Sequence, residues 1–216
     1  MSRICYIVAA ASAPCLYFAS GDRLLIAADA GYRRLKSAGI VPDLAVGDFD
    51  SLGFEPHDCE VIYHKPEKDD TDTMLAIKEG LARGYDKFVL FGALGGRIDH
   101  SYANMQALSY IAEHGGRGLM VGEGFAITAL KDGKITLSGE KGEPVSVFCT
   151  GDRAEGVRIK GLKYSLENAV LESAFPLGVS NEFVGEEAEI SVEKGSLLVM
   201  WSAEGKDAAE EFCRGE

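Results

Sequence analysis

The chain has 216 residues and a formal net charge of −12 at pH 7. This acidity disfavours nucleic acid and anionic membranes as main partners, because binding to phosphate groups requires a basic surface. No run of about 18 uncharged apolar residues occurs, so we expect no membrane span. The five cysteines are scattered and contain no CxxC pair, which argues against a disulfide framework or a zinc site and favours a reducing cytoplasm.

In the first half of the chain, near-continuous apolar runs alternate with helical patterns. We predict buried strands at 3–10, 23–28, 42–47, 59–64 and 86–92, and helices at 30–39, 71–84 and 99–114. The first run leads into the small-residue stretch AAASA, but it begins too close to the first residue for a signal peptide. The alternation predicts an α/β domain with a mostly parallel sheet and helices on both faces.

Short strands separated by turn signals replace this alternation in the second half. Hairpins are predicted around Asp132-Gly133 and around Lys194-Gly195, where a turn pair stands between two strand-like runs. We therefore expect an α/β domain over residues 1–122 and an all-β sandwich domain over residues 123–216. The polar residues 204–216 are expected to fray.

Acidic and polar residues follow four of the predicted strands. Ligands of open α/β sheets bind beyond the carboxyl ends of the strands, so we expect these loops to converge on one site. The candidates are Asp29 after the second strand, Asp48 and Asp50 after the third, Lys68, Thr71 and Asp72 after the fourth, and Gly95, Gly96, Arg97, Asp99 and His100 after the fifth.

The spacing of Asp48 and Asp50, at i and i+2, places both carboxylates on one side of an extended segment. Two carboxylates about 4 Å apart repel by roughly 4 kcal/mol at an effective dielectric near 20, so a cluster of them needs a neutralising cation. Mg²⁺ takes oxygen ligands and is commonly held by one or two carboxylates plus substrate phosphates. We therefore predict a magnesium site in these loops.

Each loop also has a purely structural interpretation. Thr71 or Asp72 can cap the helix that follows, and Asp29 can be a turn residue. The loop Gly95-Gly96-Arg97 can cradle a phosphate at a helix N-terminus, or it can be a plain glycine turn with a surface arginine. A single histidine such as His100 is more often a supporting or core residue than a catalyst.

Four segments together resemble the thiamine pyrophosphokinase family: DLAVGDFDSLG, KPEKDDTDTMLAI, GALGGRIDHSYANMQAL and GLKYSLENAVLESAFPLGVSNEF. They occur in the family's order and extend over nearly the whole chain. The first three resemble its catalytic domain, and the fourth resembles the thiamine-binding segment of its C-terminal β-sandwich. The resemblance implies transfer of a pyrophosphoryl group from ATP to the hydroxyethyl oxygen of thiamine, which gives thiamine diphosphate and AMP.

The resemblance also implies roles for individual residues and a homodimer, because thiamine sits at the subunit interface in this family. A strand aromatic and an ordinary turn are the structural alternatives for the thiamine contacts. By motif match, the residues are Asp48, Asp50 and Asp72 for Mg²⁺, Asp29 for the same acidic site, Lys68, Thr71 and Arg97 for phosphates, Asp99 for the reacting hydroxyl, and Tyr164, Ser180 and Asn181 for thiamine.

The chain departs from the family after its first strand, where AAASAPC replaces the usual glycines and leaves nucleotide contact by this loop open. Three other interpretations remain. A haloacid-dehalogenase-like phosphatase also carries a DxD loop, although there it follows the first strand rather than the third. A non-catalytic sensor of ATP–Mg²⁺ and a diphosphokinase acting on a pterin alcohol would share the acidic loops, and the fourth segment argues against the latter.

Overall fold

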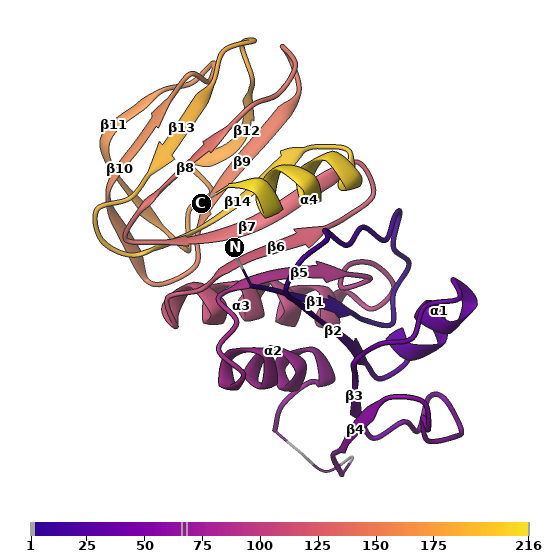
Figure 1. The fold of residues 1–216 in the computed structure, drawn as a ribbon. Helices are drawn as coiled ribbons and strands as arrows, with labels where there is room; N and C mark the ends of the chain where they lie inside the picture. The colour runs from indigo at the N-terminus through magenta and orange to yellow at the C-terminus, as the bar shows by residue number, and fades with distance from the viewer. Residues whose placement is uncertain (1–2, 66, 68, 216) are drawn as a thin grey trace.

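The chain folds around two β-sheets, which Figure 1 shows for the computed structural model. The structure describes residues 3–65, 67 and 69–215. The larger sheet has 10 strands in the order β12-β9-β14-β7-β6-β5-β1-β2-β3-β4, and the smaller has 4 strands in the order β11-β10-β13-β8. The predicted fold class, a mostly parallel α/β part followed by a C-terminal β-sandwich, is confirmed.

Strands of the first half form the parallel end of the larger sheet, with β1 between β2 and β5. Every residue of β1, β3 and β5 is buried, as their continuous apolar runs indicate. The outer strand β4 exposes Glu60 and Tyr63, so the prediction of burial on both faces is wrong there. The bounds are β1 Ile4–Val8, β2 Arg23–Ala28, β3 Leu44–Gly47, β4 Glu60–Tyr63, β5 Lys87–Phe91 and β6 Arg117–Val121.

Helices cover both faces of this parallel part. Ile77 of α2 and Leu108 of α3 belong to the core under one face, and Leu35 of α1 and Ala209 of α4 belong to the core on the other. Figure 1 shows α2 and α3 below the sheet and α4 above it. The bounds are α1 Gly31–Ser37, α2 Asp72–Ala82, α3 Ile98–Glu113 and α4 Gly205–Arg214.

A loop, residues 9–22, connects the parallel strands β1 and β2 without a helix. Phe18 of this loop packs edge-on against Tyr6 of β1, with ring centroids 5.1 Å apart. The backbone N–H of Ala19 donates to the Tyr6 hydroxyl at 2.9 Å. The loop therefore covers part of the sheet that a crossover helix usually covers.

The sandwich forms where the smaller sheet packs on the antiparallel end of the larger one. Val147 and Val199 of the larger sheet share a core with Val157 and Ile190 of the smaller sheet. The bounds are β7 Phe125–Lys131, β8 Lys134–Leu137, β9 Pro144–Cys149, β10 Arg153–Lys160, β11 Leu166–Glu172, β12 Gly178–Glu182, β13 Ala188–Ser191 and β14 Ser196–Ser202.

Both predicted hairpins are wrong, because the strands that flank each turn lie in different sheets. β7 pairs with β14 in the larger sheet, whereas β8 pairs with β13 in the smaller one. The turns are corners, and they are bonded to each other. The N–H of Asp132 donates to the carbonyl of Gly195 at 3.1 Å, and the N–H of Gly195 donates to the Asp132 carboxylate at 2.7 Å. The result is one bent, two-stranded ribbon that joins the sheets.

The C-terminal residues do not fray, so this prediction is also wrong. Residues 205–214 form α4, which packs on β6 and β7 with Ala208 and Ala209 buried. The ammonium of Lys87 donates to the carbonyl of Gly215, which holds the end of the chain against β5. Most residues of this segment are polar, so the sequence analysis overlooked the few apolar residues that recur at helical spacing.

The larger sheet runs across the predicted boundary between residues 122 and 123. The N–H of Gly122 donates to the carbonyl of Phe125 at 2.8 Å, which closes the tight turn between the antiparallel strands β6 and β7. The two predicted domains therefore share a sheet. Among the described residues, no helix is both long and apolar enough to cross a membrane.

Candidate active site

A cleft of about 470 Å³ opens where the strand order reverses, beyond the carboxyl ends of β1, β2 and β5. This is the place at which ligands bind in open α/β sheets. The cleft brings together seven of the residues predicted from sequence: Asp29, Thr71, Asp72, Gly95, Gly96, Arg97 and His100. Asp48, Asp50 and Asp99 are not part of its lining, and Lys68 lies outside the described residues.

Asp29 is held in place by its backbone as well as by its side chain. Its φ of 44° is in the left-handed region, and its N–H donates to the carbonyl of Val46 at 2.9 Å. Carboxylate oxygen Oδ2 accepts from the hydroxyl of Ser51 at 2.6 Å, whereas oxygen Oδ1 is buried without a hydrogen-bond partner among the described residues. A Cβ at Gly47 would lie 3.2 Å from the Asp29 Cα, so β3 passes directly beside this acid.

The segment from Asp48 to Asp50 is not extended, contrary to the prediction. β3 ends at Gly47, and Phe49 has a φ of 58° with its side chain buried. Alternation along a strand therefore does not apply here. Instead, the N–H of Asp50 donates to the Asp48 carboxylate at 3.2 Å, as in a turn closed by an aspartate side chain. Burial of Phe49 anchors the acidic loop to the core.

The start of α2 contributes the second acid of the cleft. Thr71 is the N-cap, and its hydroxyl accepts from the N–H of Met74 at 3.2 Å. The structural interpretation of Thr71 is thus confirmed, and the same residue also lines the cleft. Asp72 is the first helical residue and lines the cleft. Asp70 does not; its carboxylate accepts from Lys78 at 2.7 Å.

A glycine turn and Arg97 form the opposite wall, at the start of α3. Gly95 and Gly96 have φ values of 94° and 68°, and a Cβ at either would meet no atom within 4 Å. Arg97 donates to both carboxylate oxygens of Asp99, at 2.6 and 3.1 Å. The Arg97 guanidinium lowers the pKa of Asp99 from 3.8 to about 2, although both side chains are largely exposed. The amide of Asn104 ties the turn down by donating to the carbonyl of Ala93 at 2.7 Å.

The residues predicted to contact thiamine lie together in the sandwich. Asn181 is buried; its Oδ1 accepts from the N–H of Tyr164 at 2.9 Å and its amide donates to the carbonyl of Tyr164 at 2.6 Å. These bonds fix the backbone beneath the Tyr164 ring, which is exposed. Ser180 has a φ of 61° at an irregularity in the pairing of β12 with β9. Asn181 thus positions Tyr164 rather than offering its side chain to solvent.

The sandwich residues and the cleft lie far apart within one chain. Ser180 and Asn181 are on β12, at one edge of the larger sheet, while Asp29 follows β2, seven strand positions away. At about 4.8 Å per strand, the separation is roughly 30 Å. Figure 1 shows β12 and the parallel strands at opposite ends of the molecule.

Three polar residues of the cleft lining are not among those predicted from sequence: Ser51, Thr73 and Asn104. Ser51 bonds to Asp29, and Thr73 is buried in the cleft wall. Ser51 and Thr73 lie inside the acidic segments GDFDS and DDTDT. Hydroxyl groups within the acidic segments were therefore the signal that could have found them.

The cleft combines carboxylates with hydrogen-bond donors. Asp29 and Asp72 supply carboxylate oxygens, and Arg97 and the glycine turn supply hydrogen-bond donors. Within the described residues, no three His, Cys, Asp or Glu side chains gather closely enough to hold a metal ion. Mg²⁺ commonly binds through one or two carboxylates plus substrate phosphates, so the buried, unpartnered oxygen of Asp29 fits this ion.

Comparisons with known proteins extend over both parts of the chain. The family model "Thiamin pyrophosphokinase, catalytic domain" matches residues 17–117, and "Thiamin pyrophosphokinase, vitamin B1 binding domain" matches residues 133–197. A curated relative, thiamine pyrophosphokinase of Bacillus subtilis (strain 168), is 28% identical over 188 residues, which are 84% of this chain and 88% of the relative.

Solved structures are similar over almost the full length. Thiamine pyrophosphokinase from Bacillus subtilis has a TM-score of 0.79 at 25% identity and covers 94% of this chain and 100% of its own. A thiamin pyrophosphokinase family protein from Enterococcus faecalis has a TM-score of 0.77 at 29% identity, with the same coverage of 94% and 100%.

Proposed function

Since this chain belongs to the thiamin pyrophosphokinase family, whose enzymes transfer a pyrophosphoryl group from ATP to thiamine, we propose that the cleft beyond β1, β2 and β5 binds ATP with Mg²⁺. The observation that carries the proposal is the convergence of Asp29 and Asp72 with the glycine turn and Arg97 in one cleft. A polyphosphate with bound Mg²⁺ needs carboxylates for the metal ion and hydrogen-bond donors for the phosphate oxygens, and the two walls of the cleft supply these groups.

Asp72 and Asp29 are the first candidates for Mg²⁺, because both line the cleft and one buried oxygen of Asp29 has no hydrogen-bond partner among the described residues. Asp48 and Asp50 remain proposed ligands from the loop directly beside Asp29. When bound, Mg²⁺ would neutralise charge on the transferred phosphates. Ser51 would hold Asp29 in the required orientation through its 2.6 Å bond.

The phosphate end of ATP would meet the glycine turn and α3. Gly95 and Gly96 leave open space beside the backbone, and the N-cap residue Arg97 makes no side-chain capping bond at the N-terminus of α3. Arg97 would bind phosphate oxygens. Asp99 is a weak base because its pKa is about 2, so we propose that it orients Arg97 rather than accepting the thiamine hydroxyl proton.

Thiamine would be held between two subunits. Ile98 is 85% exposed and Tyr102 is 64% exposed at the start of α3 beside the cleft, and Phe175 is 65% exposed near β12 on the sandwich. Large apolar side chains exposed at both places favour a partner. In a two-fold dimer, the sandwich of one chain would cover the cleft of the other and bring Tyr164 over it, which suits a cationic thiazolium.

The test is turnover with ATP, Mg²⁺ and thiamine, measured as AMP formation by the full chain. We expect AMP with thiamine, none with a pterin alcohol, and loss of activity in EDTA that Mg²⁺ restores. Release of inorganic phosphate from monoesters would instead favour the phosphatase interpretation. ATP binding without AMP formation would favour a sensor. The five cysteines are free, which agrees with the cytoplasm as the proposed compartment.

A further inference from the structure

The connection between β3 and β4, residues 48–59, contains neither a helix nor a strand. Few of its side chains are buried, Phe49 and Leu52 among them. Such a segment is ordered only where contacts with its neighbours offset the loss of conformational entropy. The connection carries two of the proposed Mg²⁺ ligands, and its Ser51 bonds to Asp29. Whatever holds this connection in place therefore also sets the geometry of the acids.

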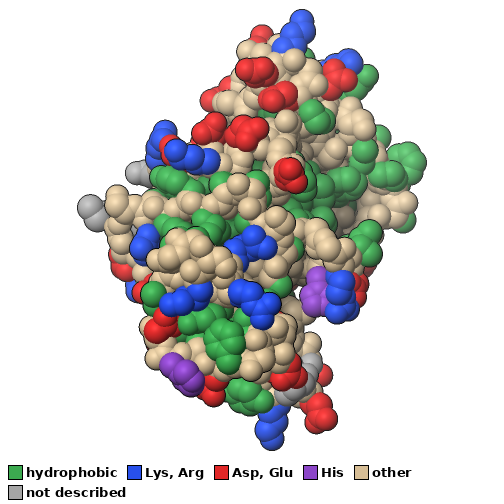
Figure 2. Space-filling model, turned by 90° about the vertical axis from the view of Figure 1, so that its right-hand side faces the viewer, with side chains coloured by type: hydrophobic (Ala, Val, Ile, Leu, Met, Phe, Trp, Pro, Cys, Tyr) green, Lys and Arg blue, Asp and Glu red, His purple; other side chains and the backbone are tan. Residues whose placement is uncertain are grey.

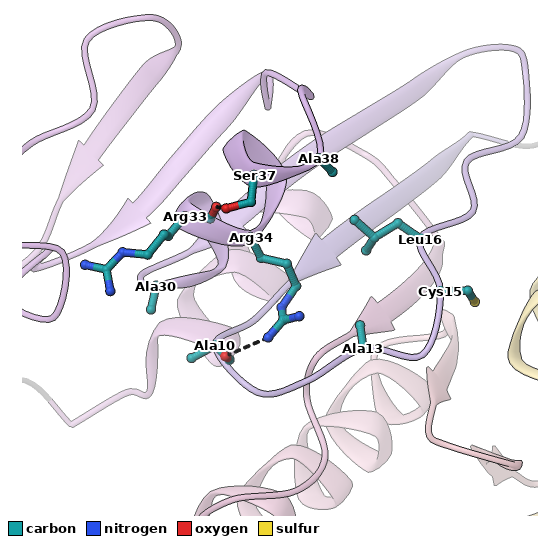
Figure 3. A pocket seen from close by; sticks show the side chains of 9 residues that line it. All are labelled: Ala10, Ala13, Cys15, Leu16, Ala30, Arg33, Arg34, Ser37 and Ala38. Atoms are coloured by element: carbon teal, nitrogen blue, oxygen red, sulfur yellow. Dashed lines mark hydrogen bonds between the residues drawn. The ribbon is translucent and has the colours of Figure 1, made fainter.

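Arg33 of α1 holds the start of the connection. Its Nη2 donates to the carbonyls of Ser51 and Leu52, both at 3.2 Å. Arg33 and Arg34 both line a cavity of about 530 Å³ beside α1, but their side chains extend in different directions (Figure 3). Arg34 reaches toward the carbonyl of Ala10, at 3.5 Å, whereas the bonds of Arg33 fix two successive carbonyls of the connection.

Asp58 ties the end of the connection to the same helix. One of its carboxylate oxygens accepts from the hydroxyl of Tyr32 at 2.5 Å, and the other accepts from the ammonium of Lys36 at 2.5 Å. Tyr32 is only 4% exposed, and its ring meets that of Phe54 edge-on, with centroids 6.1 Å apart. Because Tyr32 is packed in the core, these contacts attach the end of the connection to a fixed point.

Contact, rather than charge, distinguishes these side chains of α1. Figure 2, which faces the side that carries α1, shows Lys and Arg side chains gathered in the middle of this face. Any of these cations would add to the positive potential there. Tyr32, Arg33 and Lys36, which we call the α1 clamp, are different because they bond to one connection at both of its ends.

We propose that the α1 clamp positions the acids of this connection, so that Asp48 and Asp50 bind Mg²⁺ together with Asp29. The clamp residues act through the connection rather than by touching the ion. The path is short: the carbonyl of Ser51 accepts from Arg33, and the hydroxyl of Ser51 donates to Asp29 at 2.6 Å. The proposal rests on the proposed function, because the ion is needed there only if phosphates are bound.

The first measurement is amide hydrogen exchange in the full chain without metal or nucleotide. The N–H groups of Leu52 and Gly53 donate to the carbonyl of Phe49, at 3.0 and 3.1 Å, so their exchange reports the shape of the connection. Arg33→Met removes the guanidinium and keeps an unbranched side chain. We expect both amides to exchange faster by roughly tenfold or more, with exchange in β5 unchanged. Arg33→Lys keeps the charge but ends one atom short of Nη2, so it should behave like Arg33→Met.

The second measurement is the binding of Mn²⁺, which shares the oxygen-ligand preference of Mg²⁺, to the full chain without nucleotide. The electron paramagnetic resonance signal of the free ion reports binding. Both Arg33 variants should bind Mn²⁺ more weakly by roughly tenfold or more, as is usual when a residue that supports metal ligands is replaced. Arg214→Met, which removes the same charge from an exposed site at the end of α4, should change neither exchange nor affinity.

If Arg33→Met fails to fold, Tyr32→Phe removes only a hydroxyl from the other end of the clamp and should shift both measurements in the same direction. Four results would overturn the proposal. They are no detectable Mn²⁺ binding by the unmodified chain, unchanged exchange of Leu52 and Gly53 in Arg33→Met, faster exchange with unchanged Mn²⁺ affinity, and normal Mn²⁺ affinity in Arg33→Lys. Neither measurement needs turnover. Absence of AMP formation from ATP and thiamine would therefore reject the proposed function separately from the clamp.

Discussion

At the scale of residues, two acids close in sequence have different surroundings. Asp72 faces the cleft from the first turn of α2, whereas the Asp70 carboxylate is bonded to Lys78 outside it. The sequence KDDTD does not distinguish them, because both precede or begin the same helix. The structure makes Asp70 a natural control for Asp72.

Replacing Asp72 by asparagine should therefore lower AMP formation by roughly 100-fold or more, because a carboxylate proposed to hold Mg²⁺ against the phosphates is lost. The midpoint of thermal unfolding should stay unchanged or rise, since repulsion among the acids decreases. Asp70→Asn should keep near-normal activity. Rates measured beside thermal midpoints decide the matter, and a nearly active Asp72→Asn would remove this residue from the metal site.

The Arg97–Asp99 pair gives a prediction about pH. Because the pKa of Asp99 is lowered from 3.8 to about 2 in the folded chain, the pair contributes stability above the unfolded value. That contribution is lost as the pH falls through the folded pKa. NMR titration of the Asp99 side chain should give a midpoint near 2. In Arg97→Met the midpoint should return toward 3.8, and an unchanged midpoint would contradict the cause assigned here.

At the scale of elements, the sequence predicts the parallel strands and α2 and α3 well, because burial on both faces leaves a strong apolar signal. The sequence does not predict the two turns at which the chain passes from one sheet to the other. Asp132-Gly133 has the residues of a hairpin turn, but a hairpin and a crossing between sheets need the same local backbone. Only pairing with residues some 60 positions away, such as Gly195, decides between them.

Some features of the site are also missed by the sequence, because they depend on contacts between residues that are far apart in the chain. The acidic motifs locate Asp29, Thr71 and Asp72, since each directly follows a strand or begins a helix. They do not reveal the left-handed backbone at Phe49, which depends on burying its ring in the core. Nor do they reveal that Asn181 supports Tyr164 from beneath, because that bond joins β12 to the connection between β10 and β11.

The helix α4 offers a test at this scale. Ala209 is fully buried between α4 and the sheet, so Ala209→Asp places a charge in an apolar core. We expect the free energy of unfolding to fall by about 3 kcal/mol or more. Glu211→Asp, on the exposed side of the helix, is the matched control and should change it by less than about 0.5 kcal/mol. Equal stabilities in urea denaturation would show that α4 does not contribute to the core.

At the scale of the whole molecule, five to seven strand positions, roughly 24 to 34 Å, separate β12 from the walls of the cleft, so a composite site needs a second copy. A ligand the size of thiamine cannot reach both places in one chain. The exposed side chains of Ile98 and Phe175 lie on the two surfaces that would meet. The proposed homodimer follows from this separation together with those surfaces.

Mixing two inactive variants tests the shared site. One chain carries Asp72→Ala, and the other carries Ser180→Ala with Asn181→Ala. A mixed dimer should contain one site with an intact cleft and an intact sandwich, so AMP formation should return to a fraction of the unmodified rate. If every site were built within one chain, all would stay damaged. Failure to recover after verified subunit exchange would reject the shared site.

The bent ribbon of β7, β8, β13 and β14 has a consequence for a chain that emerges from the ribosome N-terminus first. β7 leaves the ribosome long before its partner β14, residues 196–202, so the outer edge of β7 stays open while most of the sandwich is synthesised. Such an edge is a template for intermolecular pairing, and contacts of long sequence separation close slowly. The interval between synthesis of β7 and arrival of β14 is therefore when the newborn chain is most exposed to aggregation and most dependent on chaperones.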